Sequence, residues 1–224
     1  AFGPDAAAAR IEASKVFSKD LMKKYGIPTA GYETFDDPAK VMDYIRSKGK
    51  YPVVIKADGL ALGKGVLICQ NEQEAADGVK EIMLDKKFGA SGNHVVVEEF
   101  LTGPEVSVLS FTDGKVVKPM VSSMDHKRAN DHDTGLNTGG MGTVAPNPYY
   151  TPAIAEACRE TIFLPTVRAM AAAFELLPET KYTPVLRAAV YEGLYAVGAA
   201  VLHGTFRKRQ RREEPIRKAD TDYA

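Results

Sequence analysis

The chain has 224 residues, of which 45% are hydrophobic and 26% charged, as in ordinary soluble globular proteins. Its 29 basic and 29 acidic side chains balance, so no overall charge attracts it to nucleic acid or to an anionic membrane. No run approaches the ~18 apolar residues of a membrane span, and no signal pattern opens the chain. These features predict small-molecule partners and exclude nucleic acid and membranes as main partners.

The two cysteines, Cys69 and Cys158, lie far apart in the chain and form no CxxC pair. Neither has the His or Cys spacing of a zinc site. Isolated cysteines of this kind indicate a reducing compartment, so we expect a cytoplasmic protein.

Helical and strand patterns alternate along the chain. The expected helices cover residues 8–25, 38–48, 71–83 and 151–173. The expected strands cover residues 32–35, 51–56, 66–69, 94–100, 105–111 and 115–121. Asp37 caps the second helix, and Asn71 with Glu74 has the capping-box spacing of the third. Asp113-Gly114 predicts a tight hairpin, and the Gly-, Asn- and Thr-rich residues 122–147 predict a long functional loop.

The strongest local signal is KADGLALGKG, residues 56–65, where a lysine ends a strand and a second lysine lies among three glycines. Glycines allow backbone N–H groups to approach phosphate oxygens, and lysine adds a compact positive charge. Gly59 to Lys64 matches the phosphate-binding GxxxxGK pattern, but Gly65 replaces its Ser or Thr and a strand follows instead of a helix. We therefore predict a hairpin closing over phosphates; a plain glycine-rich surface hairpin is the alternative.

Two further stretches suggest ligand contacts. In VVVEEFL, residues 95–101, an apolar strand ends in two carboxylates that could meet a purine edge and ribose hydroxyls, although solvated strand ends would look the same. The third stretch is DHKR, residues 125–128, followed by DTGLNTGGMG, residues 133–142. Its basic groups and glycines predict an anion-binding loop. A metal site involving His126 and His132, or a solvated loop, are the alternatives.

In this order the stretches resemble the glycinamide ribonucleotide synthetase family. The resemblance covers residues 1–171 and rests on four motifs: FGPxxxAAxxExSK at 2–15, IKADGLAxGKGV at 55–66, EEFLxGxE at 98–105, and DHKR…DxDTGxNTGGMG at 125–142. It implies an incomplete ATP-grasp fold, α/β with an α+β lid. The implied segments are 1–50 (start of the core), 51–120 (lid), 121–173 (substrate loop and helix) and 174–224 (divergent tail).

The resemblance implies an ATP-dependent ligation of glycine to 5-phosphoribosylamine through glycyl phosphate, with Mg²⁺ or Mn²⁺. The implied catalytic residues are Arg128 and Asn137. The residues implied to bind ATP are Lys15, Lys56, Gly59, Gly63, Lys64, Gly65, Glu98, Glu99, Phe100, Leu101 and Glu105. Those implied to bind substrates are Asp125, His126, Lys127, Asp133, Thr134, Gly135, Thr138, Gly139, Gly140 and Met141. No metal ligand is assigned.

The match departs from the family in two places. The amino-terminal domain that precedes FGP is not in the sequence, and no EFNxRFGDPE block with its magnesium-binding carboxylate follows Ala171. The basic run 207–212 resembles a nucleic-acid patch, but a foreign or frameshifted terminus explains it better. We therefore expect nucleotide binding without ligation. The alternatives are a non-catalytic nucleotide-binding module and another ATP-grasp carboxylate–amine ligase.

Overall fold

The first helical segment is interrupted at a single residue in the computed structural model, which describes residues 6–61 and 65–173. Helix α1 (Arg10–Ala13) and helix α2 (Lys15–Lys24) are separated by Ser14. The backbone of Ser14 is extended (φ −134°), so it interrupts the helix. The Ser14 hydroxyl accepts a hydrogen bond from the Phe17 N–H and so caps α2. The continuous helix expected over 8–25 is therefore wrong at this point, because Ser14 acts as a helix cap instead of a helical residue.

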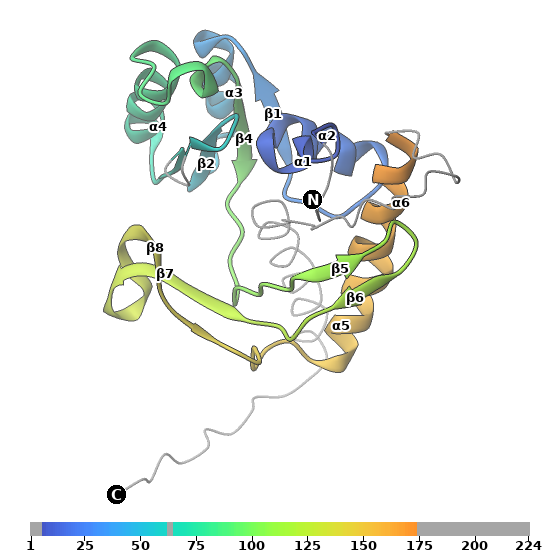
Figure 1. The fold of residues 1–224 in the computed structure, drawn as a ribbon. Helices are drawn as coiled ribbons and strands as arrows, with labels where there is room; N and C mark the ends of the chain where they lie inside the picture. The colour runs from blue at the N-terminus through green and yellow to red at the C-terminus, as the bar shows by residue number, and fades with distance from the viewer. Residues whose placement is uncertain (1–5, 62–64, 174–224) are drawn as a thin grey trace, which may run out of the picture.

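A four-stranded antiparallel sheet forms the upper part of the molecule (Figure 1). Its strand order is β1-β4-β2-β3. The strands are β1 (Tyr32–Phe35), β2 (Val53–Ala57), β3 (Val66–Cys69) and β4 (Val95–Glu99). Because β2 pairs directly with β3, residues 58–65 connect two strands of a hairpin, and the expected departure from a strand-to-helix phosphate loop is confirmed.

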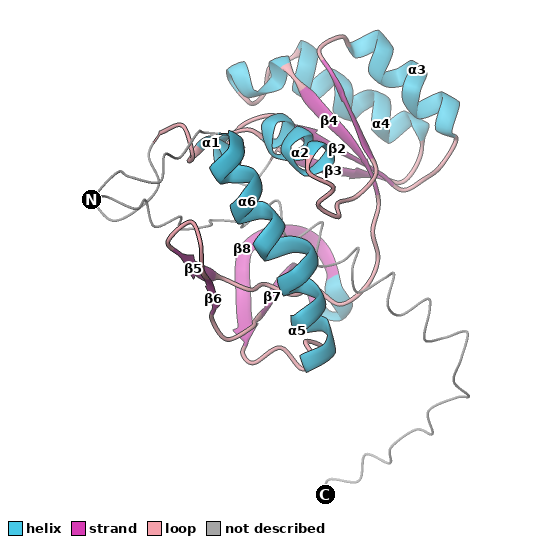
Figure 2. Cartoon of the chain, turned by 90° about the vertical axis from the view of Figure 1, so that its right-hand side faces the viewer, coloured by secondary structure: helices cyan, strands magenta, loops and turns pink. Residues whose placement is uncertain are grey.

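Helices cover one face of this sheet (Figure 2). They are α3 (Pro38–Lys48), α4 (Glu72–Val79), a π-helical turn (Lys80–Leu84) and a 3₁₀ turn (Gly89–Asn93). The expected caps are confirmed: Asp37 accepts from the Ala39 N–H, and Asn71 accepts from the Glu74 N–H. Fully buried Val41, Ile55 and Ile82 mark the core between helices and sheet.

The Gly- and Asn-rich stretch expected to be one long loop is instead a two-stranded ribbon. Strand β7 (Met124–Asn130) pairs with β8 (Thr134–Val144) around a short 3₁₀ turn (Asp131–Asp133). The pairing is irregular, with register shifts on either side of Arg128. The loop prediction was wrong because backbone pairing between distant residues, rather than a β-branched pattern, forms this ribbon.

A short hairpin and a long helical segment complete the fold. Strands β5 (Ser110–Thr112) and β6 (Val117–Pro119) are shorter than expected, but the turn at Asp113 is confirmed, since its carboxylate accepts from the N–H groups of Lys115 and Val116. Helix α5 (Pro152–Cys158), a π-helical turn (Arg159–Phe163) and α6 (Leu164–Ala173) form the helical segment expected over 151–173.

The core divides into two hydrophobic clusters. The sheet cluster joins the sheet to α3 and α4. The helix cluster joins α1 and α2 to α5, α6 and Val106, which lies in the segment before β5. Figure 1 shows the segment after β4 running from the sheet toward the β7–β8 ribbon. The segment boundaries expected at residues 50 and 120 stay predictions, although β1 and α3 pack with the sheet. Among the helices that the structure describes, none is both long and apolar enough to span a bilayer.

Candidate functional site

Three charged side chains meet on the face of the sheet opposite α3 and α4. Glu98 of β4 is 3% exposed, and its two carboxylate oxygens face two lysines. Lys19 Nζ of α2 lies 3.0 Å from Oε2, and Lys56 Nζ of β2 lies 3.1 Å from Oε1. The strand register explains the pairing: Lys56 lies opposite Val96, two residues before Glu98, so both side chains are on one face.

Burial differs among the three members of this cluster. The Lys19 and Glu98 side chains are 5% and 3% exposed, whereas Lys56 is 16% exposed. Burial lowers the pKa of Lys19, the Glu98 carboxylate counteracts this shift, and the nearby Lys56 charge lowers the pKa further. Lys19 also donates to the Thr29 hydroxyl at 2.7 Å. The cluster therefore contains two cations and one anion, and Lys56 is its accessible cation.

The buried Glu98 Oε1 atom has an ion-pair partner but accepts no hydrogen bond from any described residue. The Lys56 ammonium compensates the charge at this oxygen, and a carboxylate oxygen can accept a further hydrogen bond. The oxygen is therefore suited to accept from an N–H or O–H group of a ligand.

The first of the two predicted phosphate lysines, Lys15, meets the β2–β3 connection. Its Nζ donates to the Gly59 carbonyl at 2.6 Å. Directly beside it, the Asp58 carboxylate accepts from the Ser14 hydroxyl at 3.1 Å and from the Val16 N–H at 3.2 Å. These bonds hold the start of α2 against the glycine-rich connection, and so bring the Lys15 and Lys56 segments together.

Gly59 has a structural reason to be glycine besides any ligand contact. Its φ is +100°, and a Cβ there would lie 2.5 Å from the Ser91 hydroxyl oxygen. At the other end of the connection, the Gly65 carbonyl accepts from the Ala57 N–H at 2.8 Å and closes the hairpin. Gly63 and Lys64 lie outside the described residues.

Three more residues expected to bind ATP lie at the end of β4 and just after it. Glu99 belongs to the face opposite Glu98, because side chains alternate along a strand, and its carboxylate accepts from the Gly31 N–H at 2.8 Å. Its side chain therefore does not join the lysine cluster. Phe100 is 36% exposed and Leu101 is half-buried, both in the segment that leaves the sheet.

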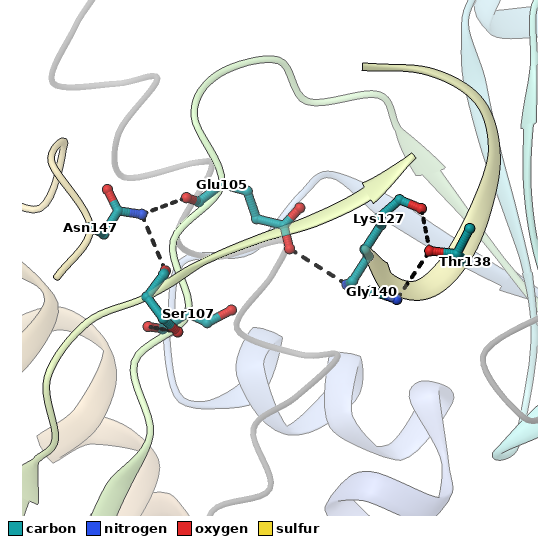
Figure 3. Close-up of polar contacts among 7 residues, drawn as sticks. Glu105, Ser107, Lys127, Thr138, Gly140 and Asn147 are labelled. Atoms are coloured by element: carbon teal, nitrogen blue, oxygen red, sulfur yellow. Dashed lines mark hydrogen bonds and ion pairs between the residues drawn. The ribbon is translucent and has the colours of Figure 1, made fainter. Parts of the chain in front are cut away.

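A second polar group links that segment to the β7–β8 ribbon (Figure 3). The Glu105 carboxylate lies 3.5 Å from Lys127 Nζ. The buried Asn147 side chain donates to the backbone carbonyls of Glu105 at 2.7 Å and Ser123 at 3.2 Å. The side-chain amide oxygen of Asn147 accepts from the Tyr149 N–H at 2.8 Å. Asn147 thus fixes the position of the Glu105 and ribbon backbones.

Within the ribbon, the expected substrate residues approach each other through backbone contacts. Thr138 donates to the Lys127 carbonyl at 2.9 Å and accepts from the Gly140 N–H at 3.1 Å. Arg128 donates to the Gly135 carbonyl at 2.7 Å. A Cβ at Gly140 would lie 3.0 Å from an Asp125 carboxylate oxygen, at a φ of +120° that disfavours other residues.

The other expected ribbon residues are open to solvent or only partly described. His126, Thr134 and Met141 are exposed. Gly139 lies in β8, and for Asp133 and Asn137 the structure describes the backbone within the turn and β8 but not the side chains. The roles expected for all these residues stay predictions.

Across 6–61 and 65–173, no three or more His, Cys, Asp or Glu side chains gather into a group that could hold a metal ion. Mg²⁺ that accompanies a nucleotide usually takes one or two carboxylates together with phosphate oxygens and waters. We therefore assign no metal ligand among these residues.

Three residues of the site were missed by sequence reasoning: Lys19, Asp58 and Asn147. Lys19 was detectable, because it follows Lys15 by four residues and shares its helical face with buried Met22. A lysine on a buried stripe indicates a paired charge. Asp58 and Asn147 carry no such signal, since their partners lie 42 to 44 and 24 to 42 residues away along the chain.

The sheet, the glycine-rich hairpin and the ribbon together form an ATP-grasp fold of the α/β class. Two solved structures of low sequence identity share this arrangement. D-alanyl-alanine synthetase A from Vibrio cholerae gives a TM-score of 0.54 at 15% identity, covering 75% of this chain and 49% of that chain. The biotin carboxylase domain of Hydrogenobacter thermophilus 2-oxoglutarate carboxylase gives 0.55 at 18%, covering 76% and 35%.

More similar proteins define the family. The chain belongs to the phosphoribosylglycinamide synthetase family, whose ATP-grasp (A) domain model matches residues 13–194. It is 52% identical over 171 residues to the phosphoribosylamine–glycine ligase of Fusobacterium nucleatum, and 49% identical over 171 residues to that of Haemophilus influenzae. Each alignment covers 76% of this chain and 40% of the relative. The chain therefore spans about two fifths of these relatives' length.

A solved structure of the family agrees with this assignment. The phosphoribosylamine–glycine ligase of Thermotoga maritima gives a TM-score of 0.68 at 38% identity, covering 75% of this chain and 42% of that chain. The resemblance expected from the four motifs, and with it the ATP-grasp fold, is confirmed.

Proposed function

We propose that this protein binds ATP at the Lys15, Lys56 and Glu98 site and takes part in the ATP-dependent ligation of glycine to 5-phosphoribosylamine. Relatives named phosphoribosylamine–glycine ligase support the reaction. The observation that carries the proposal is that Lys15 of α2 is held at the Gly59 carbonyl of the glycine-rich connection, while Lys56, on the strand that leads into that connection, lies at Glu98. A cytoplasmic location fits this metabolic role.

Lys15 and Lys56 are proposed to contact the phosphates. Lys56 is the accessible cation of a cluster with a net positive charge, and a compact ammonium group suits phosphate oxygens. Lys15 is held at the Gly59 carbonyl, so its charge lies at the same connection. Gly63 and Lys64 are proposed to close over the phosphates from this connection, together with Gly59 and Gly65.

The adenine and ribose are proposed to lie along the segment that follows β4. Glu98 Oε1 has room for one more hydrogen bond and could accept from the adenine amino group. The backbone from Glu99 to Leu101 would run along the base, and the Glu105 carboxylate would accept from ribose hydroxyls. The Lys127 contact orients that carboxylate.

The β7–β8 ribbon is proposed to bind the substrates and the reacting phosphoryl group. In the family reaction the glycine carboxylate attacks the γ-phosphorus and ADP leaves. The phosphoribosylamine nitrogen then attacks the glycyl carbonyl and phosphate leaves. Arg128 and the Asn137 position would contact the transferring phosphoryl group, and the ribbon glycines would supply backbone N–H donors at short range.

A second candidate is a nucleotide-binding module that does not ligate. It would bind the nucleotide through the same lysines, without the ribbon contacts that ligation requires, and Mg²⁺ would accompany the ATP. The metal would shield phosphate charge and orient the γ-phosphoryl group when bound.

Two measurements on the full chain distinguish the candidates. Calorimetric titration with ATP and magnesium tests binding, and phosphate release with glycine and phosphoribosylamine tests ligation. Binding with turnover supports the ligase, binding without turnover supports the module, and no binding contradicts both. Replacing Lys56 with Ala should abolish nucleotide binding, whereas Lys40→Ala, an exposed lysine of α3, should leave the affinity unchanged.

A further inference from the structure

We propose that Lys19 is a positioning residue that neutralises Glu98 and thereby leaves the charge of Lys56 available for the nucleotide phosphates. This inference rests on the proposed nucleotide binding and adds a residue that does not itself touch the ligand.

The geometry separates the two lysines by role. Each faces a different oxygen of the one carboxylate, at 3.0 Å and 3.1 Å, so Glu98 is shared between two cations. The Lys19 side chain is 5% exposed and is also held by the Thr29 hydroxyl, so a ligand cannot reach it. Lys56 is the more accessible of the two lysines, and it lies on the strand that leads into the glycine-rich connection.

Charge counting shows what Lys19 contributes. With Lys19 present, one negative and two positive groups leave a net charge of +1 at the accessible end of the cluster. Without it, Glu98 and Lys56 would form a neutral buried pair, and Lys56 would be held against the carboxylate. Interactions between charges are strong at such partly buried positions, so the loss would affect phosphate binding directly.

The test compares a ligand with phosphates to one without. In the full chain, Lys19→Met should weaken the binding of ATP by about ten-fold while changing the affinity for adenosine less than about two-fold. Lys19→Arg retains the positive charge and should preserve the ATP-to-adenosine affinity ratio. Lys24→Met, which removes an exposed charge from the same helix, is the matched control.

A second variant distinguishes electrostatics from simple structural damage. In Lys19→Met/Glu98→Gln the cluster again has a net charge of +1, because Lys56 no longer faces a carboxylate. The ATP-to-adenosine affinity ratio should therefore recover toward that of the unmodified chain. The double variant removes the buried cation and the buried anion together. No buried charge is left unpaired, so the variant should fold.

Each result has a definite meaning. Selective loss of ATP affinity in Lys19→Met with recovery in the double variant supports the proposal. Equal losses for ATP and adenosine, or no recovery in the double variant, would overturn it while the proposed nucleotide site stands. An unmodified chain that binds neither ligand would refute the proposed function, and this inference with it.

Discussion

Glu98 and Glu99 are neighbours at the end of β4 but have different surroundings. Glu98 is buried between two lysines, and exposed Glu99 accepts a single backbone hydrogen bond from Gly31 on the other face. The alternation of side chains along a strand separates them. The two carboxylates cannot be told apart from the sequence pattern, but in the structure only Glu98 belongs to the lysine cluster.

The energetic cost of losing each carboxylate should therefore differ. Glu98→Ala leaves buried Lys19 and partly buried Lys56 without a counter-charge and should lower the free energy of unfolding by about 3 to 5 kcal/mol. Glu99→Ala, the same change one residue later, should cost only about 1 kcal/mol. Urea denaturation of both variants measures the difference, and equal losses would contradict the assignment of Glu98 as the buried partner.

Cys69 predicts a pH dependence of stability at the residue scale. Burial raises the pKa of its thiol from 9.0 to about 11, with a smaller contribution from the Glu74 charge. Because the unfolded thiol ionises first as pH rises, the stabilisation is complete below about pH 9 and is lost between about pH 9 and 11, about 2 to 3 kcal/mol in all. The unfolding free energies of the unmodified chain and Cys69→Ala should be measured at several pH values. Between about pH 9 and 11, that of the unmodified chain should fall by this amount relative to that of the variant. Parallel pH profiles would show that Cys69 is not protonated more strongly in the folded state.

At the scale of elements, α2 and the glycine-rich connection are joined by Asp58. Its carboxylate accepts from a hydroxyl and an N–H group at the first turn of α2, where negative charge is also favoured by the helix dipole. Lys15 adds a bond from the same turn to the Gly59 carbonyl. A helix end and a hairpin that are about 44 residues apart in sequence are thus held as one unit.

Removing the Asp58 carboxylate should weaken the attachment of α2 to the glycine-rich connection. Asp58→Ala should lower the free energy of unfolding by about 2 kcal/mol, because charge-assisted hydrogen bonds to partly buried groups are lost. Protease cleavage within residues 58–65 should also become faster. Asp36→Ala, at an exposed aspartate before α3, is the control and should change neither quantity. If both variants behave alike, Asp58 does not join the two elements.

For the whole molecule, the two hydrophobic clusters raise the question of whether they unfold together. Ile82 is fully buried in the sheet cluster, and Ile162 is 1% exposed in the helix cluster. Polar contacts such as Lys19 with Glu98 and Asp58 with Ser14 connect the two parts. Polar links of this kind couple two cores more weakly than shared apolar packing does.

We therefore expect each cluster to respond separately to a cavity. Ile82→Ala should destabilise the sheet part by about 2 to 5 kcal/mol and accelerate amide hydrogen exchange in residues 32–99 but not in 152–173. Ile162→Ala should produce the reverse pattern. Equal acceleration of both regions in either variant would show a single cooperative unit.

The sequence predicted the elements whose signals are local. The run VVI at 53–55, the Asp37 and Asn71 caps and the Asp113-Gly114 turn each specify structure within a few residues, and each is found. The β7–β8 ribbon was missed because its glycines and polar residues have no strand propensity of their own. Its pairing depends on contacts across the ribbon, such as Thr138 with Lys127.

The sequence alone determined the family and the ATP-grasp fold, because four long motifs in a set order are specific to them. It also identified Lys15 and Lys56 as candidate phosphate ligands. Only the tertiary structure decided which side chains share a site: that Lys19 joins Lys56 on Glu98, that Glu99 faces away, and that Asp58 holds α2. The physical reason is that ion pairs and buried hydrogen bonds form between residues distant in sequence, so their partners are defined only once the chain has packed.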